Sequence, residues 1–199
     1  MKSAIELAKK LASELSPRSP SHGYDHVERV VRNVLELAKH VGGVDMDVLL
    51  VAAYLHDIGR GLPGDHAEIS AEIAYAVLIE NGFDKDFAER VREAILCHSY
   101  NRVFVAGYQC RSLEGQVLSD ADKIDASGAL GIARAFTHGG ETGRSITASL
   151  EHLRSKILRL HKCAFTEEGR KKLNRLVKRV EEFLNWIEEE LGQCAKPSS

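Results

Sequence analysis

The sequence of 199 residues contains no apolar run long enough to cross a membrane. Its first residues also lack the long apolar core of a secretion signal. The formal net charge is only −2, so no overall positive field favours binding to nucleic acid. We therefore expect a cytoplasmic protein with neither a membrane nor a nucleic-acid partner.

Cysteine is scarce, and the four cysteines are Cys97, Cys110, Cys163 and Cys194. No two of them form a Cys-x-x-Cys pair, which argues against a structural zinc site. Free thiols are the expected state of all four in an intracellular protein. One disulfide is the alternative if the source is a hyperthermophile.

Sequence features of β-sheets are also missing, because there are no paired strand patterns, internal repeats or alternating strand and helix patterns. Helical periodicity dominates, and the four prolines lie between periodic segments or near the C-terminus. Hydrophobic residues make up 44% of the chain and charged residues 28%, which is typical of a folded globular protein. We predict an all-α protein in which residues 1–199 form one bundle-like domain.

The predicted helices span about residues 2–15, 25–40, 47–58, 66–81, 84–98, 113–124, 128–137, 146–163 and 166–191. The helix over 47–58 is apolar on nearly every side, which places it in the middle of the core. Residues 100–112 are the least periodic part, and we expect a loop or small hairpin there. The apolar stripe of the last helix could also contact a second chain, so a homodimer is an open alternative.

Four acidic or imidazole side chains lie at the start, the inward side or the end of predicted core helices: His26, His56, Asp57 and Asp122. A carboxylate on the inward side of a helix is costly unless it is paired or bound to a metal. Two imidazoles and two carboxylates suit a divalent ion such as Mn²⁺, Co²⁺, Ni²⁺, Fe²⁺, Mg²⁺ or Zn²⁺. Such a site leaves positions open for water and a phosphate oxygen.

Three segments, in this order, resemble the HD-domain superfamily of metal-dependent phosphohydrolases: Gly23-Tyr-Asp-His-Val-Glu-Arg-Val30, Leu55-His-Asp-Ile-Gly59 and Ser119-Asp-Ala-Asp-Lys-Ile-Asp-Ala126. The continuation to Phe136 resembles uncharacterised bacterial and archaeal HD hydrolases, some of which resemble enzymes that cleave nucleoside triphosphates. The resemblance implies an HD-type helical bundle with a metal-binding core over residues 21–136 and helices over 146–191 packed on it. It also implies hydrolysis of a phosphate ester or anhydride, with a nucleotide as the expected substrate.

The resemblance assigns His26, His56, Asp57 and Asp122 as ligands of a divalent metal ion. Asp120 is the rival of Asp122, but the order Asp122-Lys123-Ile124 fits the family pattern better. Asp120 is then expected either to orient a ligand imidazole or to be a solvated carboxylate.

Some relatives use additional histidines for a second metal, and others use one soon after the His-Asp pair to contact phosphate. The short spacing between Asp57 and His66 favours the phosphate role for His66. Catalysis would use a metal-activated water, with His66 or His98 protonating the leaving oxygen. The expected catalytic residues are Asp122, Asp57 and His66, and the expected substrate-binding residues are His66, His98, Lys123 and Arg60.

Two other functions stay open at this point. Some HD-fold proteins resemble di-iron oxygenases, which need more histidine ligands, and the lack of histidine between His66 and His98 counts against that function. The complete ligand set counts against a metal-binding regulatory module without turnover. The phosphohydrolase should hold about one metal ion per chain.

Arg134 is a weaker site candidate, and surface or loop positions are expected for His22, His40, His138, His152 and His161.

Overall fold

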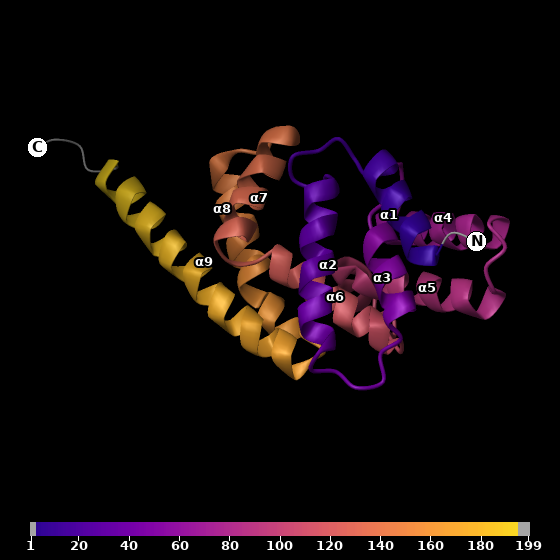
Figure 1. Ribbon diagram of the computed structural model, residues 1–199. Coiled ribbons are helices and arrows are strands. Elements are labelled where there is room, and N and C mark those ends of the chain that lie inside the picture. Colours follow the sequence, from indigo (N-terminus) through magenta and orange to yellow (C-terminus); the bar gives the residue numbers. More distant parts are fainter. Residues whose placement is uncertain (1–2, 195–199) are drawn as a thin grey trace, which may run out of the picture.

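The computed structural model of the protein describes residues 3–194. Over that range the chain folds into helices joined by loops, and the only β-type contact is an isolated bridge between Arg60 and Leu62 (Figure 1). The predicted all-α class is therefore confirmed. The helices are α1 (Ala4–Leu15), α2 (Tyr24–Ala38), α3 (Met46–Leu55), α4 (His66–Glu80), α5 (Lys85–His98), η1 (Asn101–Val105), α6 (Leu113–Asp125), α7 (Gly128–Glu141), α8 (Ile146–Ser155), η2 (Ile157–Cys163) and α9 (Glu167–Cys194).

Helix α3 lies in the core, as its apolar sequence predicts, and packs against α1, α2, α5 and α6. Its residues Val48, Leu49 and Val51 are fully buried. Burying an apolar side chain of this size stabilises the fold by roughly 1.5–3 kcal/mol. The backbone that leads into the His-Asp pair is therefore held firmly in the centre of the molecule.

The predicted helix over 47–58 ends earlier than expected, because α3 stops at Leu55 and the His-Asp pair lies in the turn that follows. Close packing against α4 explains the turn. A Cβ atom at Gly59 would lie 2.8 Å from the backbone nitrogen of Ser70, so only glycine allows this approach. The Gly59 N–H donates a hydrogen bond to the Ser70 hydroxyl at 2.9 Å, which fixes the turn to α4.

Asp120 of α6 fixes the start of α9. Its fully buried carboxylate accepts hydrogen bonds from the backbone nitrogens of Phe165 (3.0 Å) and Thr166 (2.7 Å), and from the Thr166 hydroxyl (2.8 Å). The Lys123 ammonium lies 3.6 Å from the same carboxylate. Both expectations for Asp120, a solvated carboxylate or a partner of a ligand imidazole, are therefore wrong.

Other segments also differ from the sequence prediction. Within residues 100–112, where we expected a loop or small hairpin, residues 101–105 form a short π-helix and residues 106–112 form a loop. The predicted helix over 146–163 is divided into α8 and the 3-10 helix η2. Helix α7 continues beyond the expected end at residue 137, through Gly139 to Glu141. Gly139 lies inside the helix because α7 packs closely against α8 there, and a Cβ atom would lie 2.5 Å from the Ser149 hydroxyl oxygen.

A disulfide joins Cys97, near the end of α5, to Cys110, and their Cα atoms are 5.1 Å apart. The prediction of free thiols is therefore wrong for this pair, because the chain between them turns back through η1 and brings the two cysteines together. Cys163 is a free thiol, as predicted. The side chain of Cys194 lies outside the part of the chain that the structure describes.

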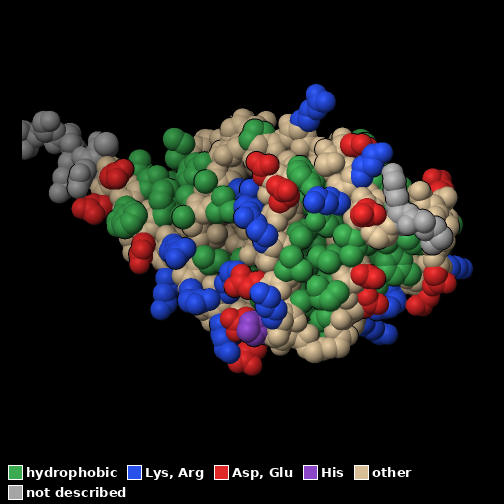
Figure 2. All heavy atoms as spheres, viewed as in Figure 1, with side chains coloured by type: hydrophobic (Ala, Val, Ile, Leu, Met, Phe, Trp, Pro, Cys, Tyr) green, Lys and Arg blue, Asp and Glu red, His purple; other side chains and the backbone are tan. Residues whose placement is uncertain are grey.

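Helix α9 extends away from the rest of the molecule toward the C-terminus (Figure 1), and exposes Trp186 and Leu191 there. On the face in Figure 2, basic and acidic side chains are interspersed around a central apolar patch. Within residues 3–194, every helix is too short or too polar to span a lipid bilayer. The homodimer stays a prediction.

Replacing Asp120 by alanine should lower the free energy of unfolding by about 3 kcal/mol, because Lys123 and two backbone N–H groups lose a buried partner. Urea denaturation of the chelator-treated protein measures this loss. Asp84→Ala is the matched control, since it removes only the exposed cap of α5 and should cost about 1 kcal/mol. Equal losses for the two variants would contradict this role of Asp120.

Candidate active site

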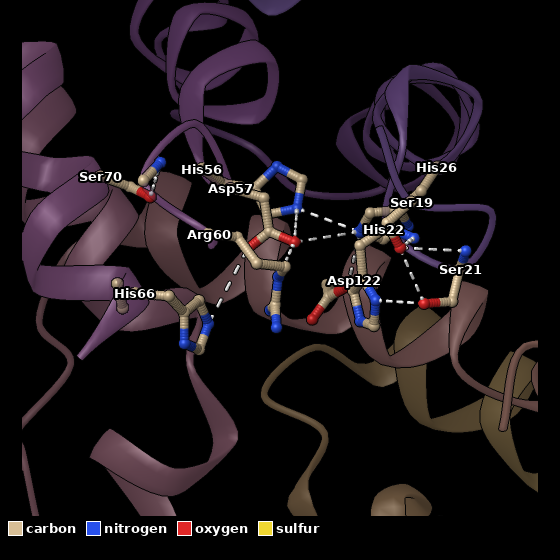
Figure 3. A network of polar contacts seen from close by, with 12 residues as sticks. Ser19, Ser21, His22, His26, His56, Asp57, Arg60, His66, Ser70 and Asp122 are labelled. Atoms are coloured by element: carbon tan, nitrogen blue, oxygen red, sulfur yellow. Dashed lines mark hydrogen bonds and ion pairs between the residues drawn. The ribbon is translucent and has the colours of Figure 1, made fainter. Parts of the chain in front are cut away.

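The four side chains predicted to bind metal converge at one point (Figure 3). The Nε2 atoms of His26 and His56 are 3.2 Å apart, and His26 Nε2 is 3.5 Å from Oδ1 of Asp122. Oδ2 of Asp57 lies 3.7 Å from His26 Nε2 and 3.8 Å from His56 Nε2. These atoms are close enough to share one ion, so the proposed ligand set is sterically feasible.

Hydrogen bonds on the outer side of the imidazoles set their tautomers. Nδ1 of His56 donates to the carbonyl oxygen of Ala53 at 2.8 Å, and Nδ1 of His98 donates to that of Ile95 at 2.6 Å. A carbonyl oxygen can only accept, so each neutral ring keeps its lone pair on Nε2, on the side of the cluster. Burial lowers the pKa of His56 to about 4. His56 therefore stays in the neutral form that binds metals at neutral pH.

Asp57 stands between two groups of histidines. Its Oδ2 faces His26 and His56, whereas its Oδ1 lies 3.8 Å from Nε2 of His66 and 3.7 Å from Nε2 of His98. Two clusters of possible ligand atoms, each within 4.8 Å, result: His26, His56 and Asp122, and Asp57, His66 and His98. His66 and His98, which the sequence analysis assigned to the substrate, thus lie where a second ion could bind.

Two buried atoms without a hydrogen-bond partner indicate whether this cluster fits a metal. Oδ1 of Asp57 and Nε2 of His98 are buried and have no hydrogen-bond partner among the described residues. Leaving such groups unsatisfied costs roughly 1–3 kcal/mol each. A divalent cation binds both carboxylate oxygen and imidazole nitrogen, so it would satisfy both atoms. The residues present therefore fit a divalent metal.

Two basic residues predicted to bind substrate are engaged with protein groups. Nε of Arg60 donates to Oδ2 of Asp57 at 2.6 Å. Burial would raise the pKa of Asp57, but the charge of Arg60, together with the imidazoles of His56, His98 and His26, holds that pKa well below its usual range. Nζ of Lys123 donates to the Ser119 hydroxyl at 2.7 Å and is only slightly exposed. Both residues line the pocket, but their charges also hold the site together.

Asp125 was missed by the sequence analysis, although it has the role considered for Asp120. Its buried carboxylate accepts hydrogen bonds from Nδ1 of His26, Nε of Arg29 and Nη1 of Arg134, each at 2.7 Å. It therefore fixes the orientation of His26 and leaves Nε2 of that ring to face the cluster. The sequence feature that could have identified Asp125 is its position three residues after Asp122 on the same helix.

A cavity of about 360 Å³ opens beside the cluster. Asp122 is the one carboxylate among its described lining residues. The basic lining residues are Arg60, Lys123, Arg134, Arg144 and Lys156, and the histidines are His22, His66, His98, His138 and His152. Such a lining produces a positive potential that favours anionic ligands.

His22 lies in a loop, as expected, whereas the expectation of surface or loop positions is wrong for His138 and His152, which are half-buried in helices. All three histidines line this cavity. His22 has a polar support, because its Nδ1 lies 2.7 Å from the Ser21 hydroxyl, which itself donates to Glu141 at 2.5 Å. The polar contacts of His22 and Ser21 appear in Figure 3. No helical periodicity marks these residues, because they reach the cavity from segments distant in sequence.

Replacing Asp125 by asparagine should weaken metal binding by about 10–100-fold, because His26 loses the carboxylate that orients it. Isothermal titration of chelator-treated protein with Mn²⁺ measures this effect. Asp25→Asn is the control, since Asp25 adjoins His26 in sequence but is exposed. Equal affinities for the wild type and Asp125→Asn would refute the orienting role.

The metal-free protein should lose stability on acidification. Burial lowers the pKa of His56 and of His66 to about 4, whereas an unfolded histidine titrates near pH 6.5. Between these values the unfolded chain binds more protons, so the free energy of unfolding falls as the pH drops from about 6.5 toward 4. Urea denaturation with a chelator, at several pH values in that window, measures the slope. A flat profile would contradict the buried neutral state of these rings.

The comparisons with known proteins agree with this geometry. The HD domain family model matches residues 23–127. The uncharacterised protein YpgQ of Bacillus subtilis is 30% identical over 177 residues, which cover 85% of this chain and 84% of that protein. The crystal structure of YpgQ in complex with ADP has a TM-score of 0.74 at 24% identity, and covers 95% of this chain and 97% of that one.

Two further crystal structures are similar over nearly the whole chain. A protein from Lactobacillus plantarum has a TM-score of 0.85 at 25% identity, and the match covers 97% of this chain and 99% of that one. A predicted HD-superfamily hydrolase from an uncultured Thermotogales bacterium has a TM-score of 0.62 at 30% identity, with 94% and 91% covered. This chain therefore belongs to the HD-domain superfamily of metal-dependent phosphohydrolases.

Proposed function

We propose that this enzyme hydrolyses a phosphate ester or anhydride bond of a nucleotide. The observation that carries the proposal is the position of the basic cavity, which opens directly onto the His and Asp cluster. A phosphate group drawn into a positive cavity would lie next to the ligands of the metal. The relative YpgQ, whose crystal structure is described as a complex with ADP, supports a nucleotide as the substrate class.

In this proposal His26, His56, Asp57 and Asp122 hold a divalent cation. When bound, such a cation polarises a phosphoryl oxygen and lowers the pKa of water. The two oxygens of Asp57 also allow a second ion on the side of His66 and His98, so we propose that the site holds up to two ions. This number exceeds the single ion that the sequence favoured.

The side chains around the cluster position the reacting groups. Burial would raise the pKa of Asp122, but the neighbouring imidazoles of His26, His56 and His98 together lower it, so this carboxylate stays anionic at neutral pH. Asp122 lines the cavity, where it accepts a hydrogen bond from the attacking water and orients it. Asp120 does not take this role, because its carboxylate is buried against the start of α9. His66 lines the same cavity and contacts a phosphate or leaving-group oxygen.

The oxygenase alternative gains one observation, because His66 and His98 supply the additional imidazoles that two irons need. The cavity argues for the phosphohydrolase instead. Its lining holds five lysine and arginine side chains, whose charge suits a phosphorylated substrate rather than an uncharged one. We therefore retain phosphate hydrolysis as the proposed reaction.

A screen of nucleotides with added Mn²⁺, Co²⁺, Ni²⁺ or Mg²⁺ should detect release of phosphate or pyrophosphate by the wild type. His56→Ala and Asp57→Ala should reduce the rate to background, because each removes a metal ligand. His40→Ala, which changes an exposed histidine outside the cavity, should leave the rate unchanged. Elemental analysis of the same samples measures the ions per chain. A metal-loaded wild type that releases neither product from any nucleotide would overturn the proposal.

A further inference from the structure

We propose that Arg144, His152 and Lys156 form a second anion subsite, which binds the phosphate groups of a nucleoside di- or triphosphate that are not attacked. The inference rests on the proposed function and specifies its substrate class. All three residues line the cavity. They belong to the turn after α7, to α8 and to the residue that follows α8, outside the residues 23–127 that match the HD family model.

The other basic residues of the cavity already have protein partners. Arg60 donates to Asp57, and Lys123 donates to Ser119. Arg134 donates to Asp125 at 2.7 Å and to the carbonyl oxygen of Ser21 at 2.8 Å. These charges stabilise the site itself.

Arg144 differs, because its Nη1 is buried and has no hydrogen-bond partner among the described residues. Its backbone is fixed nevertheless. The Arg144 N–H donates to the carbonyl oxygen of Gly139 at 2.7 Å, and Gly143 makes the preceding turn with a φ of +68°. An arginine held in place with an unsatisfied N–H in a cavity is prepared to bind an oxyanion.

Lys156 and His152 stand one helical turn apart, where side chains four residues apart share a face of the helix. The Lys156 ammonium lies 5.0 Å from the centre of the Tyr100 ring, and forms no ion pair with any described carboxylate. Lys156 lines the same cavity as Asp122 and Arg60, whose charges act on its pKa in opposite directions.

The electrostatic environment of this group favours an anion. Burial, followed by the charges of Lys156 and Arg144, lowers the pKa of His152 to about 4. Two cations and an imidazole thus lie together, and no described carboxylate forms an ion pair with them. A bound anion would reduce the repulsion between the two cations. If the phosphate that is attacked lies beside the metal ligands, Arg144, His152 and Lys156 remain available to bind the other phosphates of the same substrate.

The test compares kcat/KM for the mono-, di- and triphosphate of one nucleoside. The wild type should prefer the di- or triphosphate. Arg144→Gln and Lys156→Gln should each lower kcat/KM for that substrate about tenfold more than for the monophosphate, since a charged hydrogen bond is lost. Arg154→Gln is the matched control, because Arg154 lies in the same segment but pairs with Glu188 outside the cavity. It should leave the ratio unchanged.

A binding experiment separates this inference from the proposed reaction, because it needs no turnover. Inorganic pyrophosphate should bind the Mn²⁺-loaded wild type more tightly than inorganic phosphate does, as measured by calorimetry. Arg144→Gln and Lys156→Gln should lose most of that difference, whether or not nucleotides are hydrolysed. Equal affinity of the wild type and both variants for pyrophosphate, or an equal loss for phosphate and pyrophosphate, would overturn the subsite.

Discussion

The carboxylate of Asp57 is almost fully buried, so neighbouring groups must compensate its negative charge. The arrangement of the surrounding helices depends on this requirement. Its two oxygens face different pairs of imidazoles, and Arg60 binds the same group from the cavity side. A buried carboxylate is costly unless charges or metal ions balance it. The packed helix α3 holds it in place, and the helices that carry the histidines must converge there.

Helix α6 links this cluster to the rest of the chain through three aspartates with different roles. Successive helical residues are rotated by about 100°, so Asp122 and Asp125 lie about 60° apart, whereas Asp120 lies on the opposite side. Asp122 and Asp125 therefore both reach His26. Asp120 instead binds the start of α9. One short segment thus contributes a proposed metal ligand, orients the ring of His26 and attaches the C-terminal helix.

The C-terminal helices do more than cover the metal-binding core. The residues matched by the HD family model contain both clusters around Asp57, whereas α7, α8 and η2 contribute a further wall of the cavity. That wall carries Arg144 and Lys156, whose charges are not used to build the site. In the proposed function, the core binds the metal and the added helices select the anion, so one core chemistry can act on different substrates.

The sequence alone determined the helical class and brought together His26, His56, Asp57 and Asp122. It could do so because helical periodicity and the order of short motifs are local properties of the chain. The sequence could not predict the roles of Asp120 and Asp125, because both lie on one helix. Only the elements that pack on each side of that helix distinguish them. The Cys97–Cys110 bond depends on how η1 turns the chain back. The cavity positions of His22, His138 and His152 depend on contacts between segments that are distant in the sequence, such as the ring contact of His22 with His138. Only the tertiary structure decides such contacts.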